Sequence, residues 1–126
     1  MLSSKEEAAR LGREGERRVA EYLRKHGYII VKRNWRDSRF GEIDIIAENR
    51  ENIVFVEVKT RSGNALVSGV EAIDANKARR IKNAALVFMR KLNTTLSPRI
   101  DVAQVTVDTD KDGKSTWKLK YIKSAI

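Results

Sequence analysis

The sequence predicts an α/β fold in which a mixed central sheet is flanked by helices and the elements follow the order α-β-β-β-α-β-β. Residues 4–26 and 74–92 carry apolar side chains at helical spacing. Residues 28–61 and 99–122 instead contain β-branched apolar runs separated by polar turns. The length of 126 residues is typical of a single domain, and we expect one domain that spans residues 1–126.

The first helix is expected to begin at Ser3 or Ser4 and to run to about His26, just before Gly27. A serine followed three residues later by a glutamate is typical of a capping box. A glycine directly after the last turn is typical of a helix end. Both ends of this helix are therefore signalled in the sequence.

Gly12 and Gly15 lie inside this helix, where each glycine is about 1 kcal/mol less favourable than alanine. Either another backbone or a ligand approaches the helix closely at these positions, or the first turn frays and ends near Leu11. Glu16 follows directly and lies on or beside the apolar stripe of the helix.

Residues 28–32 are expected to form the first strand, and residues 34–40 a loop. The loop region is rich in arginine, with Trp35 and Phe40 interleaved, a combination that suits phosphate contact and base stacking. The alternative is that the two aromatic rings plug the edge of the core. The candidate contacts to nucleic acid are Arg33, Trp35, Arg36 and Arg39, together with Arg61 further along the chain.

Residues 41–61 predict a β-hairpin with a polar loop at residues 48–52. Its strands are rich in isoleucine and valine, with no proline to interrupt them. Because side chains alternate along a strand, Glu42 and Asp44 are expected to share one face of the first strand.

On the second strand of the hairpin, Glu57 and Lys59 are expected to share one face. A loop centred between residues 50 and 51 would place Asp44 directly opposite Glu57, with Cβ atoms roughly 5 Å apart. Two carboxylates this close repel each other unless a cation neutralises them, and magnesium would do so. The alternative is an ordinary hairpin whose polar residues face water.

Asp74 is expected to cap a second helix that runs to about Leu92. Lys77, the first basic residue of this helix, is a candidate phosphate contact, whereas most of the other basic residues are expected to form a solvated face. Residues 99–107 and 116–122 are expected to form the last two strands. Because the helix joins the third strand to the fourth, these two strands should be parallel.

The composition limits the kinds of partner and site. Lysine and arginine number 26 against 17 acidic residues, a net charge of +9, which favours nucleic acid over a membrane as partner. With no cysteine and one histidine, thiolate and histidine-rich metal sites are excluded, so any metal must rest on oxygen ligands. No apolar run approaches the roughly 20 residues of a membrane span. We expect a cytoplasmic protein without membrane association.

An acidic residue followed after about a dozen positions by Glu-x-Lys, as in Asp44 and the EVK of residues 57–59, resembles the PD-(D/E)XK nuclease superfamily. The fuller string GEIDIIA…VFVEVKTR resembles the YraN family of small bacterial proteins, which is described as uncharacterised and nuclease-like. It is similar, more distantly, to archaeal Holliday-junction resolvases. The GREGE of residues 12–16 also resembles the opening motif of the YraN family.

This resemblance implies a restriction-endonuclease-like core in a single PD-(D/E)XK nuclease-like domain. It implies metal-dependent hydrolysis of DNA, including branched or structured DNA in repair or recombination, with Mg²⁺ or Mn²⁺ as the cofactor. Because Glu42 is expected to share the face of Asp44, it is a candidate supporting or alternate ligand. The catalytic residues implied are Glu16, Asp44, Glu57 and Lys59, and the metal ligands implied are Glu16, Asp44, Glu57 and the main-chain carbonyl of Val58.

Some alternatives stay open. The family has a Gly-x-Pro where this chain reads Val67-Ser68-Gly69, which leaves the substrate contacts of residues 62–70 undefined. A catalytically inactive nucleic-acid-binding module on the same fold is the alternative function, and a purely structural partner protein is a third class. The presence of all four implied catalytic residues favours the enzyme. A homodimer is expected if the substrate is a junction, because two symmetric sites would then be needed.

Overall fold

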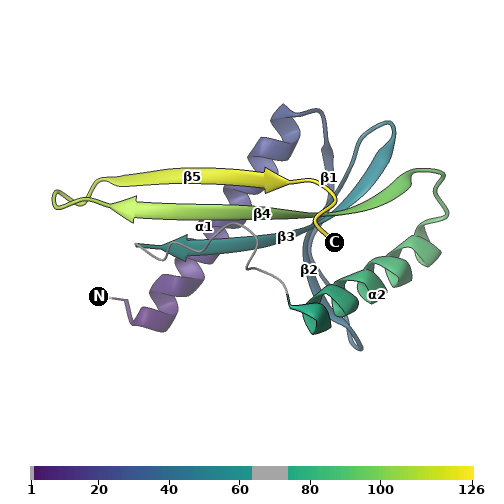
Figure 1. The fold of residues 1–126 in the computed structure, drawn as a ribbon, viewed down its shortest axis with the longest axis horizontal. Helices are drawn as coiled ribbons and strands as arrows, with labels where there is room; N and C mark the ends of the chain where they lie inside the picture. The colour runs from purple at the N-terminus through teal and green to yellow at the C-terminus, as the bar shows by residue number, and fades with distance from the viewer. Residues whose placement is uncertain (1, 64–73) are drawn as a thin grey trace.

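The computed structural model describes residues 2–63 and 74–126, so the departure at Val67-Ser68-Gly69 lies outside the described residues. The order of the elements is the predicted α-β-β-β-α-β-β (Figure 1). The elements are α1 (Ser4–Lys25), β1 (Ile29–Asp37), β2 (Gly41–Glu48), β3 (Asn52–Ser62), α2 (Ala75–Leu92), β4 (Ser97–Thr109) and β5 (Ser115–Ile122).

The five strands form one mixed sheet in the spatial order β1-β2-β3-β4-β5. β3 and β4 are parallel, as expected for strands joined by the crossover that contains α2, and the other neighbours are antiparallel. The predicted mixed α/β architecture is therefore confirmed. Within the described ranges, no helix combines the length and the apolar character needed to cross a bilayer.

The two helices pack against different sides of the sheet. Leu23 of α1 belongs to a buried cluster with Val54 and Val56 of β3, whereas Phe88 of α2 belongs to a second cluster with Phe55. Because neighbouring residues of a strand point to opposite faces, the alternation of valine and phenylalanine along β3 assigns α1 to one face and α2 to the other. β3 is thus covered on both sides.

Helix α1 is capped as predicted and is continuous through both of its glycines. The Ser3 side chain accepts a hydrogen bond from the Glu6 N–H at 3.1 Å, and the Ser3 N–H donates to Glu6 Oε1 at 3.2 Å. The alternative of a frayed first turn ending near Leu11 is therefore wrong. A Cβ at Gly15 would overlap Thr60 Oγ1 and lie 3.2 Å from Thr60 Cβ, whereas a Cβ at Gly12 would meet no described residue within 4 Å. Among the described residues the close approach occurs at Gly15, and the neighbour is a side chain of β3 rather than the expected backbone or ligand.

Replacing Gly15 with alanine is therefore expected to destabilise the protein by about 1–3 kcal/mol, because the helix must move away from β3. Replacing Gly12 with alanine is the matched control, since it adds the same methyl group to the same helix where no described residue lies within 4 Å. That change should stabilise the protein by up to about 1 kcal/mol. Urea unfolding of both variants measures the difference, and equal stabilities would contradict the close contact.

Strand β1 is longer than predicted. It continues through Trp35 to Asp37, with an irregular register between Ile30 and Lys32, and only residues 38–40 remain as a loop. Asp37 fixes this turn, because its Oδ1 accepts hydrogen bonds from the N–H groups of Arg39 and Phe40 at 2.8 and 3.1 Å. The expected loop at residues 34–40 is wrong for its first four residues, because their pairing with β2 outweighs their polar, turn-like composition.

Candidate functional site

The central strands β2 and β3 separate at the residues singled out by the sequence. Their pairing runs from Glu48 opposite Ile53 to Ile45 opposite Val56, which is the predicted register. Beyond this point β2 stays paired with β1, and β3 stays paired with β4 from Glu57 onward. Figure 1 shows β3, β4 and β5 running together away from β2. The sheet therefore opens into a fork, and Asp44 and Glu57 are the first residues inside it.

Asp44 lies in the plane of the sheet. Its Oδ2 accepts a hydrogen bond from the Val58 N–H at 2.8 Å, where a backbone carbonyl of β2 would otherwise be expected. Ile43 packs in the cluster on the α2 side and Ile45 in the cluster on the α1 side, so the strict alternation of side chains breaks between them. The expectation that Glu42 and Asp44 share one face rests on that alternation and stays a prediction.

Glu57 is buried and is held by two ammonium groups. Its carboxylate is only 6% exposed, and its Oε1 lies 2.5 Å from Lys77 Nζ and 3.6 Å from Lys59 Nζ. Lys59 shares the face of Glu57, as predicted from the alternation along β3. Lys77 reaches the same carboxylate from the first turn of α2, where the Asp74 side chain caps the helix by accepting from the Lys77 N–H at 2.8 Å.

Glu16 of α1 approaches the fork from the other helix. Arg33 of β1 lies near it, with 3.8 Å between Arg33 Nη2 and Glu16 Oε1. The Asn34 amide, in the orientation that satisfies both partners, donates to Glu16 Oε1 at 3.0 Å and to Glu42 Oε1 at 2.9 Å. Asn34 has a φ of 53°, a backbone conformation that asparagine tolerates better than most residues. Glu42 is also paired with Arg36 at 2.9 Å.

The carboxylates perturb one another's protonation. Burial, followed by the charge of Glu57, raises the pKa of Asp44 to about 7, although the Val58 hydrogen bond opposes the shift. Burial also raises the pKa of Glu16, against the charge of Arg33. Burial and then the neighbouring Lys77 ammonium lower the pKa of Lys59. For Lys77 the cost of burial is outweighed by Glu57, so its pKa is raised. Groups with shifted pKa values gathered in one place are typical of functional sites.

The candidate metal ligands in the fork are chemically suited to magnesium or manganese, but they are not arranged as a complete coordination site. All of them are oxygens, and Asp44 forms no ion pair with a lysine or arginine among the described residues. Within residues 2–63 and 74–126, however, no three acidic or histidine side chains are grouped so as to hold a metal ion. Among the other carboxylates, the charge of Glu57 acts more strongly on Asp44 than the charge of Glu16 does.

The candidate nucleic-acid contacts are placed in several ways. Three are exposed arginines already paired with carboxylates, namely Arg33 with Glu16, Arg36 with Glu42 and Arg39 with Asp37. Arg61 is exposed near the end of β3. The Trp35 ring packs edge-on against Phe88 at 5.3 Å between centroids, and Phe40 packs on the same cluster. Both rings therefore pack at the edge of the core, as in the alternative given for them, and contact of Trp35 with nucleic acid stays a prediction.

Two features of the site were missed in the sequence. Asn34 was assigned only to a loop, although its amide joins Glu16 to Glu42. Lys77 was singled out as a phosphate contact, which stays a prediction, but its ion pair with Glu57 was not expected. The sequence feature that could have indicated this contact is the position of Lys77 in the first turn of α2, just after the helix cap at Asp74.

The comparisons with known proteins agree on one family. The model of the family described as "Uncharacterised protein family UPF0102" matches residues 15–105. A UPF0102 protein of Syntrophomonas wolfei is 42% identical over 118 residues, which cover 92% of this chain and 96% of the relative. One from Persephonella marina is 48% identical over 111 residues, covering 87% and 95% of the two chains. A third, from Bacteroides thetaiotaomicron, is 35% identical over 116 residues, covering 92% and 91%. The YraN-like membership expected from the sequence is thereby confirmed: the chain belongs to the uncharacterised protein family UPF0102.

Proposed function

We propose that this protein is a metal-dependent endonuclease of the PD-(D/E)XK superfamily that hydrolyses phosphodiester bonds in DNA. The observation that carries the proposal is the pair Asp44 and Glu57 with Lys59 beside them, at the point where the two central strands separate. An opening in the middle of a sheet gives a phosphodiester access to groups that are otherwise buried. A net charge of +9 is consistent with a polyanionic substrate.

Asp44 and Glu57 are the residues that would hold Mg²⁺ or Mn²⁺, together with the main-chain carbonyl of Val58. The repulsion between the two carboxylates, which helps to raise the pKa of Asp44 to about 7, is what a cation would relieve. The Val58 N–H points to Asp44, and the N–H and C=O of one strand residue point to the same side. Bound there, the metal would polarise the phosphodiester and make an attacking water more acidic.

The remaining residues of the site bind and orient. Lys59, with its lowered pKa and its contact to Glu57, would hold the attacking water or stabilise negative charge on the reacting phosphate. Lys77 would exchange its contact with Glu57 for a substrate phosphate. Glu16, which is linked to Glu42 through Asn34, would keep the far side of the fork polar and hydrated.

A specific observation also favours a second candidate, a nucleic-acid-binding module that does not cut. The Lys77 ammonium already neutralises Glu57, and no group of three acidic side chains in the described ranges is arranged for a metal. A site of this kind would bind phosphate through its lysines without any need for a cation.

The deciding experiment is a titration of Mg²⁺ and Mn²⁺ against labelled branched, single-stranded and duplex DNA, with wild type, Asp44→Asn and Glu57→Gln compared. We expect cleavage that requires the metal and falls by at least about 1000-fold in both variants, because each variant removes a charged group from the reacting centre. Asp44→Asn leaves the contacts of Lys59 and Lys77 with Glu57 in place. A loss of activity in this variant would therefore not result from the release of these lysines. Salt-sensitive binding by all three proteins without cleavage of any substrate would refute the nuclease and leave the binding module.

A further inference from the structure

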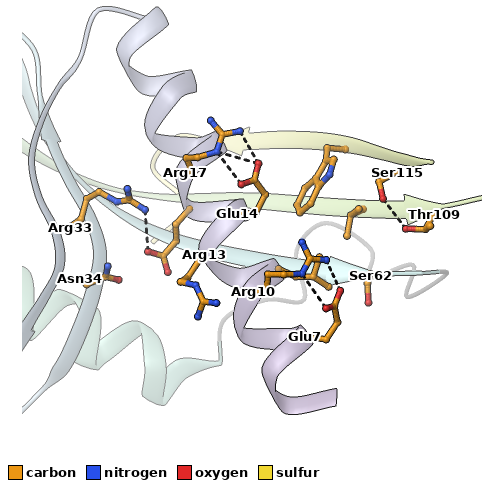
Figure 2. A pocket seen from close by; sticks show the side chains of 14 residues that line it. Glu7, Arg10, Arg13, Glu14, Arg17, Arg33, Asn34, Ser62, Thr109 and Ser115 are labelled. Carbon is orange, nitrogen blue, oxygen red and sulfur yellow. Dashed lines mark hydrogen bonds and ion pairs between the residues drawn. The ribbon is translucent and has the colours of Figure 1, made fainter. Parts of the chain in front are cut away.

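A polar groove follows α1 on the side where β5 and the end of β3 lie. It consists of two hollows, of about 960 and 360 Å³, which share Arg17 and Trp117 in their walls. The larger hollow, shown in Figure 2, lies between α1 and the ends of β3, β4 and β5. The smaller one continues between α1 and β5. We call the two together the α1–β5 groove.

The α1–β5 groove is basic. Counting Arg17 once, its described walls carry seven lysines and arginines against four glutamates. Several arginines have exposed carboxylate partners on the same helix, such as Arg10 with Glu7 and Arg17 with Glu14 (Figure 2). Exposed ion pairs of this kind are weak and are readily exchanged for the stronger, bidentate pairing of arginine with phosphate. Arg13 is exposed and makes no ion pair or hydrogen bond with any residue in the described ranges.

An aromatic ring stands where the two hollows meet. Trp117 is only partly buried, and the Arg18 guanidinium lies 4.5 Å from the centre of its ring. A tryptophan and an arginine in a basic groove form a surface on which unpaired bases can stack. Duplex DNA has its bases stacked on one another and cannot use such a ring, so this feature favours a single strand.

The groove also reaches the site in the fork. Glu16, Arg33 and Asn34 line the larger hollow, and the same three residues form the polar link beside the fork. Asn34 lies on β1 between Arg33 and Trp35, whose partners on β2 are Ile45 and Ile43, so Asn34 is beside Asp44 in the sheet. A strand lying in the groove would therefore end close to Asp44 and Glu57.

We propose that the α1–β5 groove binds a single-stranded segment of nucleic acid, with phosphates at Arg13 and Arg33 and a base stacked at Trp117, and directs the segment to the fork. The substrate class that follows is DNA with an unpaired segment, such as a flap or a splayed branch. The cleavage of that substrate rests on the proposed nuclease function, whereas the binding does not.

Binding is measured by fluorescence anisotropy with a labelled oligothymidylate and with a duplex of equal length, in EDTA at fixed salt so that cleavage cannot occur. We expect wild type to prefer the single strand. Arg13→Ala should weaken its binding about fivefold to tenfold, and Trp117→Phe by a similar factor. Arg80→Ala is the matched control, because it removes an equally exposed arginine from α2, on the other face of the sheet, and should change binding by less than about twofold.

The two tryptophans of the chain allow the bound strand to be located. Trp35 packs against Phe88 on the α2 side, whereas Trp117 lines the groove. In Trp35→Phe the remaining fluorophore is Trp117, and oligothymidylate should quench its fluorescence. In Trp117→Phe the remaining Trp35 fluorescence should not change.

The results separate the groove from the nuclease. Any one of three results would overturn the groove proposal: equal losses of binding in Arg13→Ala and Arg80→Ala, quenching of Trp35 alone, or a preference for duplex DNA. This holds even if metal-dependent cleavage is found. If binding depends on the groove residues but no DNA is cleaved, the groove proposal stands and the nuclease proposal is rejected. Circular dichroism of Arg13→Ala should match wild type, since Arg13 contacts no described side chain that holds the fold.

Discussion

Replacing Asp44 with asparagine is expected to stabilise the protein by roughly 2–4 kcal/mol at pH 8 and to flatten its dependence on pH. The reason is that the pKa of Asp44 is raised to about 7 in the folded chain, from an ordinary value of 3.8, by burial and by Glu57. Asparagine keeps an oxygen that can accept the Val58 N–H bond but carries no charge.

The sign of this expected change in stability follows from how tightly the folded and unfolded states bind the Asp44 proton. The folded state holds the Asp44 proton more tightly than the unfolded state does, so this group contributes stability below about pH 4. That contribution is lost as the pH rises through about 7. Wild type and Asp44→Asn should therefore have similar free energies of unfolding near pH 4, and the variant should become the more stable one above neutrality.

Urea unfolding at several pH values between 4 and 8.5 tests this expectation. Added Mg²⁺ should raise the midpoint of wild type at pH 8 and leave that of Asp44→Asn nearly unchanged, because the cation would relieve a repulsion that the variant lacks. A variant that is less stable than wild type at pH 8 would show that Asp44 is stabilised by a partner other than the Val58 N–H.

Replacing Asp101 with asparagine is expected to destabilise the protein by about 3–5 kcal/mol. Asp101 is fully buried on β4 and accepts bidentate hydrogen bonds from Arg99, a bond from the Tyr121 hydroxyl at 2.6 Å and one from the Ser124 N–H at 2.9 Å. Arg99 also donates to the Tyr28 hydroxyl at 2.6 Å. The network joins β4 to β5, to the residues after β5 and to the start of β1, and an amide would leave Arg99 without its counter-charge.

Asp108→Asn is the matched control, because Asp108 lies on the same strand but is exposed, and its replacement should cost less than about 0.5 kcal/mol. Tyr121→Phe, which removes a single donor, should cost about 1–2 kcal/mol. Thermal and urea unfolding give the three values. If Asp101→Asn were as mild as Asp108→Asn, the charge of Asp101 would contribute little to stability.

Much of the site was visible in the sequence because it depends on local pattern. The register that brings Asp44 to Glu57 follows from the length of one hairpin loop, and the face shared by Glu57 and Lys59 follows from alternation along one strand. The helix caps at Ser3 and Asp74 were also local signals. The prediction of a loop at residues 34–40 was wrong for its first four residues, because their pairing with β2 outweighed their local composition.

By itself the sequence determined the order of the elements, the parallel pairing of β3 with β4, the basic character of the chain and the candidate carboxylates, since each depends on periodicity, loop length or composition. Tertiary structure alone decided that Lys77 contacts Glu57, that Thr60 rests against Gly15, and that Tyr28 and Tyr121 join the pair formed by Arg99 and Asp101. These contacts join residues whose separation along the chain carries no signal. They exist because packing two helices onto a twisted, forked sheet brings those side chains together.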